Sequence, residues 1–209
     1  MSDFILEIYG EEIPSSAQSL IENQFEKLFS QLLEDNEIKY KDLLTFSTSR
    51  RVVVYVNGLN NYINSKQVEV RGPQVDASDK AIQGFLKSNN LVNVKQLETK
   101  VIKDKSYFVF KQKTKKYNIA DILKTETPKI LQSIKWVKSM RWGNHNDRWI
   151  RPIKNILCIF NKKLLKIKFA DLDSNKFTFG NYHFEEKKIQ YTNYLTYREK
   201  LKKTFVMLD

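Results

Sequence analysis

FILEIYGEEIPSSAQSLIENQFEKLFSQLLED, residues 4–35, joins a short apolar run to a segment with helical periodicity. Residues 4–9 are an almost uninterrupted apolar run typical of a buried strand, and the letters GEEIP then end it. From Ser15 or Ser16 to Asp35 the apolar residues recur at intervals of three or four, which predicts an amphipathic helix with either serine as its N-cap. The start of the chain therefore predicts a buried strand that leads directly into a long helix.

The remaining sequence alternates strand and helix patterns irregularly. We expect strands at residues 51–56 (closed by Asn57-Gly58), 68–70, 101–102, 107–110, 155–160, 164–169 and 176–184, with hairpin turns at 103–105 and 161–163. We expect helices that begin at Asp76 or Ser78, that run from Asn118 toward Trp136 with an interruption or kink at Pro128, and that span Asn193 to Lys203. Because no regular βαβ unit and no repeat occur, the predicted fold class is α+β, with mixed or antiparallel sheets, hairpins and several packed helices.

The length of 209 residues suits one domain, or two closely packed lobes, over residues 1–209, since no linker rich in Pro, Gly or Ser divides the chain. Residues 204–209 begin what reads as a further strand and then stop, which favours a truncated chain. No apolar run approaches the roughly 18 residues that span a membrane, and the N-terminus lacks a secretory signal pattern. A single cysteine, Cys158, fits a reducing cytoplasm, and its place in an apolar strand favours a buried structural thiol.

The charge balance is strongly basic. Thirty-six Lys and Arg stand against 24 Asp and Glu, a formal net charge of +12. Such an excess favours polyanionic ligands, above all nucleic acid, although a Lys-rich chain can also be basic through nucleotide bias alone.

Arginine is scarce and clustered. Only seven of the 36 basic residues are Arg, and six of them fall in three short segments. These six are Arg50, Arg51, Arg71, Arg141, Arg148 and Arg151. Guanidinium groups bind phosphate or carboxylate in a bidentate manner and stack on aromatic rings, so these positions are candidates for phosphate contacts; structural ion pairs are the alternative for each.

Residues 135–152, KWVKSMRWGNHNDRWIRP, form the densest candidate site. The segment sets three indoles, Trp136, Trp142 and Trp149, among Lys138 and the arginines named above. Indoles beside cations are a common means of stacking unpaired bases while neutralising phosphates. A tryptophan cluster that lines the core is the equally weighted alternative.

Catalytic chemistry is not apparent in the sequence. It has no Gly-rich phosphate loop, no Cys-x-x-Cys near its two histidines, and no nucleophile with a base at motif spacing. Glu11 and Glu12 precede the first helix, where their simplest role is to complement its dipole. Arg71-Gly72-Pro73 reads as a turn. We therefore expect a binding or assembly module without catalytic residues, metal or cofactor of its own.

Six short motifs, taken in order, resemble the glycyl-tRNA synthetase beta subunits of bacterial heterotetrameric type. The motifs are Glu7-Ile8-Tyr9-Gly10-Glu11-Glu12-Ile13-Pro14, Ser49-Arg50-Arg51, Arg71-Gly72-Pro73, Lys80-Ala81-Ile82-Gln83-Gly84-Phe85, Lys138-Ser139-Met140-Arg141-Trp142-Gly143 and Trp149-Ile150-Arg151-Pro152. Each is weak alone, but their shared order covers about residues 3–205, the N-terminal α+β region of that family.

The resemblance implies a role in ATP-dependent attachment of glycine to tRNA(Gly). It implies two alpha and two beta chains, with the aminoacylation site and the use of ATP in the alpha subunit and tRNA recognition in the beta subunit. It also implies that a C-terminal anticodon-binding part of the family is absent from these 209 residues.

The sequence departs from the family pattern at residues 180–184, GNYHF, where the family has Gly-His-Arg. Together with the early end of the chain, this departure is compatible with a split or decaying gene. The alternative function is accordingly an assembly module, or a decayed fragment, without tRNA affinity of its own.

Overall fold

The computed structural model describes residues 2–64, 69–102, 104–111, 116–184 and 187–208. The chain forms two compact units: unit 1 contains residues 1–63 and 117–209, and unit 2 contains residues 64–116. The strands pair into several antiparallel sheets, and α-helices accompany them, which confirms the predicted α+β class.

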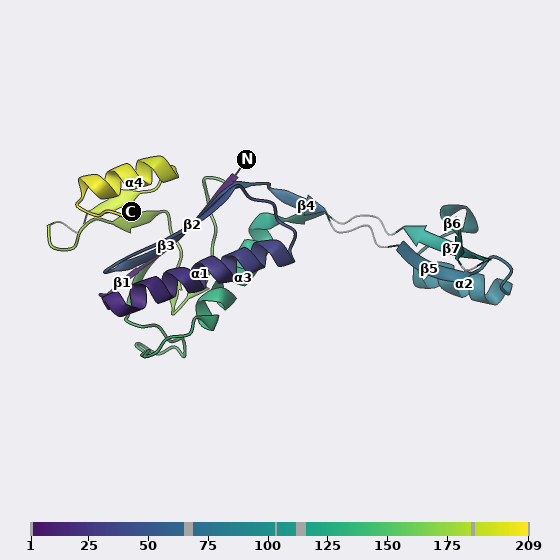
Figure 1. Ribbon diagram of the computed structural model, residues 1–209, viewed down its shortest axis with the longest axis horizontal. Helices are drawn as coiled ribbons and strands as arrows, with labels where there is room; N and C mark the ends of the chain where they lie inside the picture. Colours follow the sequence, from purple (N-terminus) through teal and green to yellow (C-terminus); the bar gives the residue numbers. More distant parts are fainter. Residues whose placement is uncertain (1, 65–68, 103, 112–115, 185–186, 209) are drawn as a thin grey trace. The chain divides into compact units, whose positions relative to one another are not determined.

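An antiparallel five-stranded sheet forms the centre of unit 1 (Figure 1). Its strand order is β10-β9-β1-β3-β2. The strands are β1 (Ser2–Gly10), β2 (Asp42–Thr48), β3 (Arg51–Leu59), β9 (Ile153–Phe160) and β10 (Lys163–Leu164). The first strand thus lies in the middle and pairs along its length with both β3 and β9.

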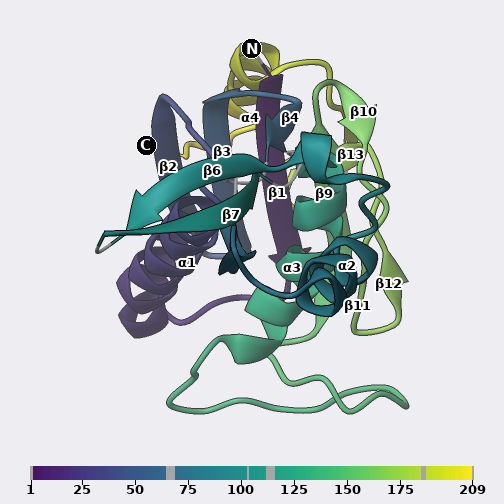
Figure 2. The ribbon, with the colours of Figure 1, turned by 90° about the vertical axis from the view of Figure 1, so that its right-hand side faces the viewer.

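Helices cover both faces of this sheet. α1 (Ser15–Asp35) and α3 (Ile119–Ser133) lie on one face and α4 (Tyr194–Lys203) on the other (Figures 1 and 2). Successive strand residues point to opposite faces, so Leu6 packs in the core with α1 and α3 while Ile5 packs in the core with α4. This double burial explains why the first strand is an apolar run instead of an alternating pattern.

Three pairs of short strands lie outside the five-stranded sheet. They are β4 (Tyr62–Asn64) with β8 (Lys116–Asn118), β11 (Lys168–Phe169) with β12 (Leu172–Asp173), and β13 (Phe177–Phe179) with β14 (Lys188–Gln190). Asn118 caps α3 by accepting a hydrogen bond from the backbone N–H of Ala120, and Asn193 caps α4 in the same way from Thr196.

Unit 2 is a three-stranded antiparallel sheet with one helix. The order is β5-β7-β6, built from β5 (Glu69–Gln74), β6 (Glu98–Ile102) and β7 (Lys105–Lys111), and α2 (Asp79–Ser88) and a 3-10 turn, η1 (Val94–Gln96), lie between β5 and β6 in the chain. A Cβ on Gly72 would lie 2.8 Å from the Phe85 ring, so this glycine allows β5 to approach α2 closely.

Most elements match the sequence prediction. The first strand and the first helix are confirmed, as are the hairpin β6–β7 and the helices that begin near Ser78, at Asn118 and at Asn193. The turn between β9 and β10 uses Asn161 and Lys162 at positive φ.

Several strand predictions were wrong. The first strand of the predicted hairpin at 155–169 is confirmed, but its second strand ends at Leu164. Lys168–Phe169, which was predicted to continue that strand, pairs with β12 instead. Ala170 and Asp171 form the turn between these two strands at positive φ. Residues 204–208 form no strand, and the region predicted at 176–184 is reduced to β13. β2 was not predicted from the sequence, and it pairs in antiparallel orientation with β3.

Boundary predictions were wrong at four other places. α1 follows Pro14 without a side-chain cap from either serine, and α3 runs through Pro128 but ends at Ser133. The RGP segment is part of β5, with a bulge between Arg71 and Gln74, instead of a turn. β3 was predicted to close at Asn57-Gly58 but continues to Leu59. Gly58 has φ +74°, and a Cβ at this position would lie only 2.6 Å from Lys41 Cβ, so both the backbone conformation and the available space favour glycine here. The predictions for Val68, Lys103 and Asp209 lie outside the described residues.

Candidate nucleic-acid interface

Arg51 is buried in unit 1 with a carboxylate of its own. Its side chain is 2% exposed and its Nη1 donates to Glu7 Oε2 at 3.2 Å. Thr178 and Tyr197 also donate to the Glu7 carboxylate, and Arg51 Nη2 donates to the Phe179 carbonyl at 2.9 Å. Burial and the adjacent Glu7 carboxylate raise the pKa of Tyr197 well above its ordinary value. This geometry is that of a structural ion pair, which joins β1 and β3 to β13 and α4.

Arg50 lies at the edge of the same region. Its Nε donates to the buried Gly10 carbonyl at 3.0 Å, and its Nη2 is 3.2 Å from Glu11 Oε2. Lys154 also binds Glu11, at 2.7 Å, and this hydrogen bond is the largest cause that holds the pKa of Glu11 below its ordinary value. Glu11 therefore bridges two cations, whereas the sequence favoured a role at the helix dipole.

Arg71 belongs to unit 2 and is exposed. Its guanidinium carbon lies 3.7 Å from the centroid of the Tyr107 ring, a cation–π contact. A hydrogen bond from Gln74, with a smaller contribution from Arg71, lowers the pKa of Tyr107. Arg71 thus belongs to unit 2, whereas the other candidate residues belong to unit 1.

The other candidates lie in the segment from Ile134 to Pro152, which we call the α3–β9 loop. Two interactions anchor it. Gln24 of α1 exchanges hydrogen bonds with the backbone of Lys135 at 2.8 and 2.9 Å, and Met140 and Trp149 exchange backbone hydrogen bonds across the loop. The loop is thus tied to α1 at its start and closed upon itself.

The indoles of this loop face mainly inward. Trp149 is 3% exposed and packs against Phe25, Trp136 and Phe169. Trp142 is partly buried and meets His145 edge to face at 4.7 Å. Trp149 thus belongs to the core cluster that was the alternative reading, whereas Trp136 is only partly buried.

The cations of the loop face outward. All five are exposed, and among the described residues none has a carboxylate within ion-pair distance. They are Lys135, Lys138, Arg141, Arg148 and Arg151. Arg148 donates to Ser139 Oγ at 3.0 Å and Arg151 to the Ile150 carbonyl at 3.0 Å, contacts that orient the side chains but leave their charge uncompensated.

The single carboxylate of the loop, that of Asp147, already has hydrogen-bond partners outside the five cations. Asp147 accepts hydrogen bonds from Gln132 at 3.2 Å and from the backbone N–H of Ala170 at 3.1 Å, and lies 3.9 Å from His145 Nδ1. The buried indole therefore anchors a loop whose exposed charge is uniformly positive. Sequence alone gave the composition of this segment but not the opposite orientation of its indoles and cations.

A hollow of about 400 Å³ opens beside the loop. Its walls come from Pro14 and the start of α1, with Ala17 and Leu20, and from the loop itself, with Trp136 and Ile150. Lys138 and Arg151 also line it. The arrangement combines an apolar interior with two exposed cations.

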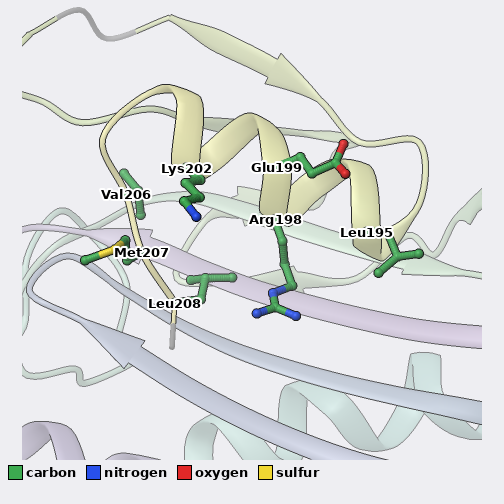
Figure 3. Close-up of a pocket in the computed structure, with 7 residues that line it drawn as sticks. All are labelled: Leu195, Arg198, Glu199, Lys202, Val206, Met207 and Leu208. Carbon is green, nitrogen blue, oxygen red and sulfur yellow. The ribbon is translucent and has the colours of Figure 1, made fainter.

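Another hollow, of about 310 Å³, lies between α4 and the segment 206–208. Arg198 and Lys202 extend from α4 toward Met207 and Leu208, whereas Glu199 points away (Figure 3). Leu195, Phe205 and Met207 are 69%, 65% and 72% exposed, so this face carries bare apolar surface.

The described residues contain no catalytic constellation that we recognise. They hold no group of three or more His, Cys, Asp or Glu side chains arranged for a metal ion, and none of their helices has the length and apolarity to cross a membrane. Cys158 is completely buried, which confirms the expected buried position, and burial raises the pKa of its thiol.

Comparison with known proteins identifies a family to which the chain is similar. Residues 4–209 match the family described as glycyl-tRNA synthetase beta subunit. The chain is 36% identical over 209 residues to the glycine–tRNA ligase beta subunit of Rickettsia bellii, covering 100% of this chain and 32% of that protein. The corresponding protein of Rickettsia felis is 35% identical over 211 residues and that of Rickettsia typhi 35% over 209, with 100% of this chain and 32% and 31% of those proteins covered. The chain thus spans about a third of the length of these curated relatives.

Proposed function

Because the chain belongs to the glycyl-tRNA synthetase beta-subunit family, we propose that it is the N-terminal portion of such a subunit and contributes tRNA recognition to the attachment of glycine to tRNA(Gly). The working enzyme in this proposal contains two alpha and two beta chains and acts in the cytoplasm. ATP is consumed by the complex, the aminoacylation site lies in the alpha subunit, and this chain holds no cofactor.

The observation that carries the RNA-binding role is the exposed charge of the α3–β9 loop. Five cations without carboxylate partners among the described residues lie within residues 134–152, and the loop is anchored through Trp149 and Gln24. Phosphate contacts dominate the affinity of proteins for nucleic acid, and a preorganised basic surface suits them. Arg50 and Arg51 have a structural role in this proposal, because both side chains are mostly buried and form ion pairs with Glu11 and Glu7.

Arg141→Ala is expected to weaken tRNA binding and to lower the salt dependence. Loss of one phosphate contact reduces the slope of log affinity against log salt by about 1. The measurement is a filter-binding titration with tRNA at several salt concentrations. Lys202→Ala, which removes an equal charge from α4 on the other face of the sheet, is the matched control and is expected to leave the slope unchanged. Equal behaviour of the two variants, both folded, would contradict a role for Arg141.

An assembly module is the second candidate function. The exposed Leu195, Phe205 and Met207 beside α4 favour protein docking, because bare apolar patches of this kind mark interaction surfaces. The same titration separates the two: absence of tRNA binding even at low salt favours assembly alone.

A further inference from the structure

The hollow beside the α3–β9 loop has walls of two kinds. Ala17 and Leu20 of α1, with Ile150 and Trp136 of the loop, supply apolar surface, and Leu20 is still 38% exposed. The partly buried Trp136 is held edge to face against Trp149 at 4.8 Å, so the core fixes its position. Flat apolar ligands with aromatic character fit such walls best.

The charges beside the hollow are of one sign. Lys138 and Arg151 line it, both exposed and without an ion-pair partner among the described residues. The first turn of α1 also borders it and has neither a side-chain cap nor an acidic residue, so no carboxylate of this turn offsets the positive end of the helix dipole. An anionic group is therefore favoured next to an apolar one.

We propose that this hollow holds one unpaired nucleotide of an RNA strand, with its base between Trp136 and the start of α1 and its phosphate beside Lys138 and Arg151. The inference rests on the proposed function and gives it a specific contact. A base stacked on an indole beside a cation is a general mode of single-strand recognition.

An RNA strand suits the surroundings better than an acidic peptide does. Lys135, Arg141 and Arg148 extend the positive charge along the loop beyond the hollow, so the ligand carries charge at repeated positions. A phosphate backbone has one charge per nucleotide, and each base offers an apolar face regardless of sequence.

The test fills the hollow without removing charge. Ala17→Trp places an indole inside it, and Ser19→Trp places the same side chain on an exposed position of α1 that does not line the hollow. Binding of an unstructured single-stranded RNA oligonucleotide to the full chain is measured by fluorescence anisotropy over a salt series. Ala17→Trp is expected to weaken binding about 5- to 150-fold, as loss of one stacked base does, without changing the salt slope, while Ser19→Trp has no effect.

Each outcome separates the nucleotide site from the wider proposal. Equal affinity of Ala17→Trp and wild type, both salt-dependent, overturns the nucleotide site but leaves RNA binding by the loop intact. Absence of wild-type binding at low salt instead overturns the proposed function. Tighter binding of poly-glutamate than of RNA, abolished by Ala17→Trp, would make the occupant an acidic peptide and also overturn the site. Ala17→Leu, a smaller filling, replaces the first variant if circular dichroism shows that Ala17→Trp does not fold.

Discussion

Arg51→Ala is expected to lower the free energy of unfolding of unit 1 by about 3–5 kcal/mol, the cost of leaving one partner of a buried ion pair without the other. The loss is large because Glu7 is completely buried and would keep, among the described residues, only its hydroxyl donors, Thr178 and Tyr197. Urea denaturation followed by circular dichroism measures the change.

Two further variants identify the cause. Lys129→Ala breaks the exposed pair with Glu126 in α3 and is expected to cost at most about 0.5 kcal/mol. Adding Glu7→Gln to Arg51→Ala removes the uncompensated charge and is expected to restore part of the lost stability. If Arg51→Ala costs no more than Lys129→Ala, the buried pair does not hold the layers of unit 1 together.

Replacing the five cations of the α3–β9 loop by glutamine is expected to remove most of the salt dependence of tRNA binding. Five phosphate contacts give a slope of about 3.5–4.5, so wild-type affinity falls on the order of a few hundred-fold between 50 and 200 mM salt. The variant should show little of this fall, and its affinity at 50 mM salt should be correspondingly lower.

A control with equal charge change isolates the position of the charge. Five exposed lysines elsewhere in unit 1, none in an ion pair with a described residue, are changed to glutamine in the control. They are Lys162, Lys163, Lys176, Lys202 and Lys203. Equal loss of salt dependence in both variants would mean that net charge, and not the loop, attracts the RNA.

The sequence predicted elements best where local pattern and tertiary burial agree. The first strand was readable because both of its faces are buried, in the cores that contain Leu6 and Ile5. β2 was not, because DLLTFST is half exposed and mixes polar with apolar residues, and its extended form depends on pairing with β3 over residues 51–57. The second strand of the 155–169 pair was extended too far, since periodicity does not reveal which strand will be the partner.

The candidate site shows the same division. Composition picked out the α3–β9 loop, but the exposure of its cations and the burial of Trp149 depend on packing against Phe25 and Phe169. Arg51 could not be distinguished from a ligand-binding arginine, because its partners Glu7 and Thr178 lie 44 and 127 positions away in the chain. The hollow beside α1 was not predicted either, since its walls come from segments more than 100 residues apart.

Ultraviolet crosslinking of bound tRNA, followed by mass spectrometry of the crosslinked peptides, tests most directly whether the α3–β9 loop is the RNA interface. We expect crosslinks in residues 134–152 and at the start of α1, and none in α4. Crosslinks confined to residues 194–208, with the loop unmodified, would contradict the account.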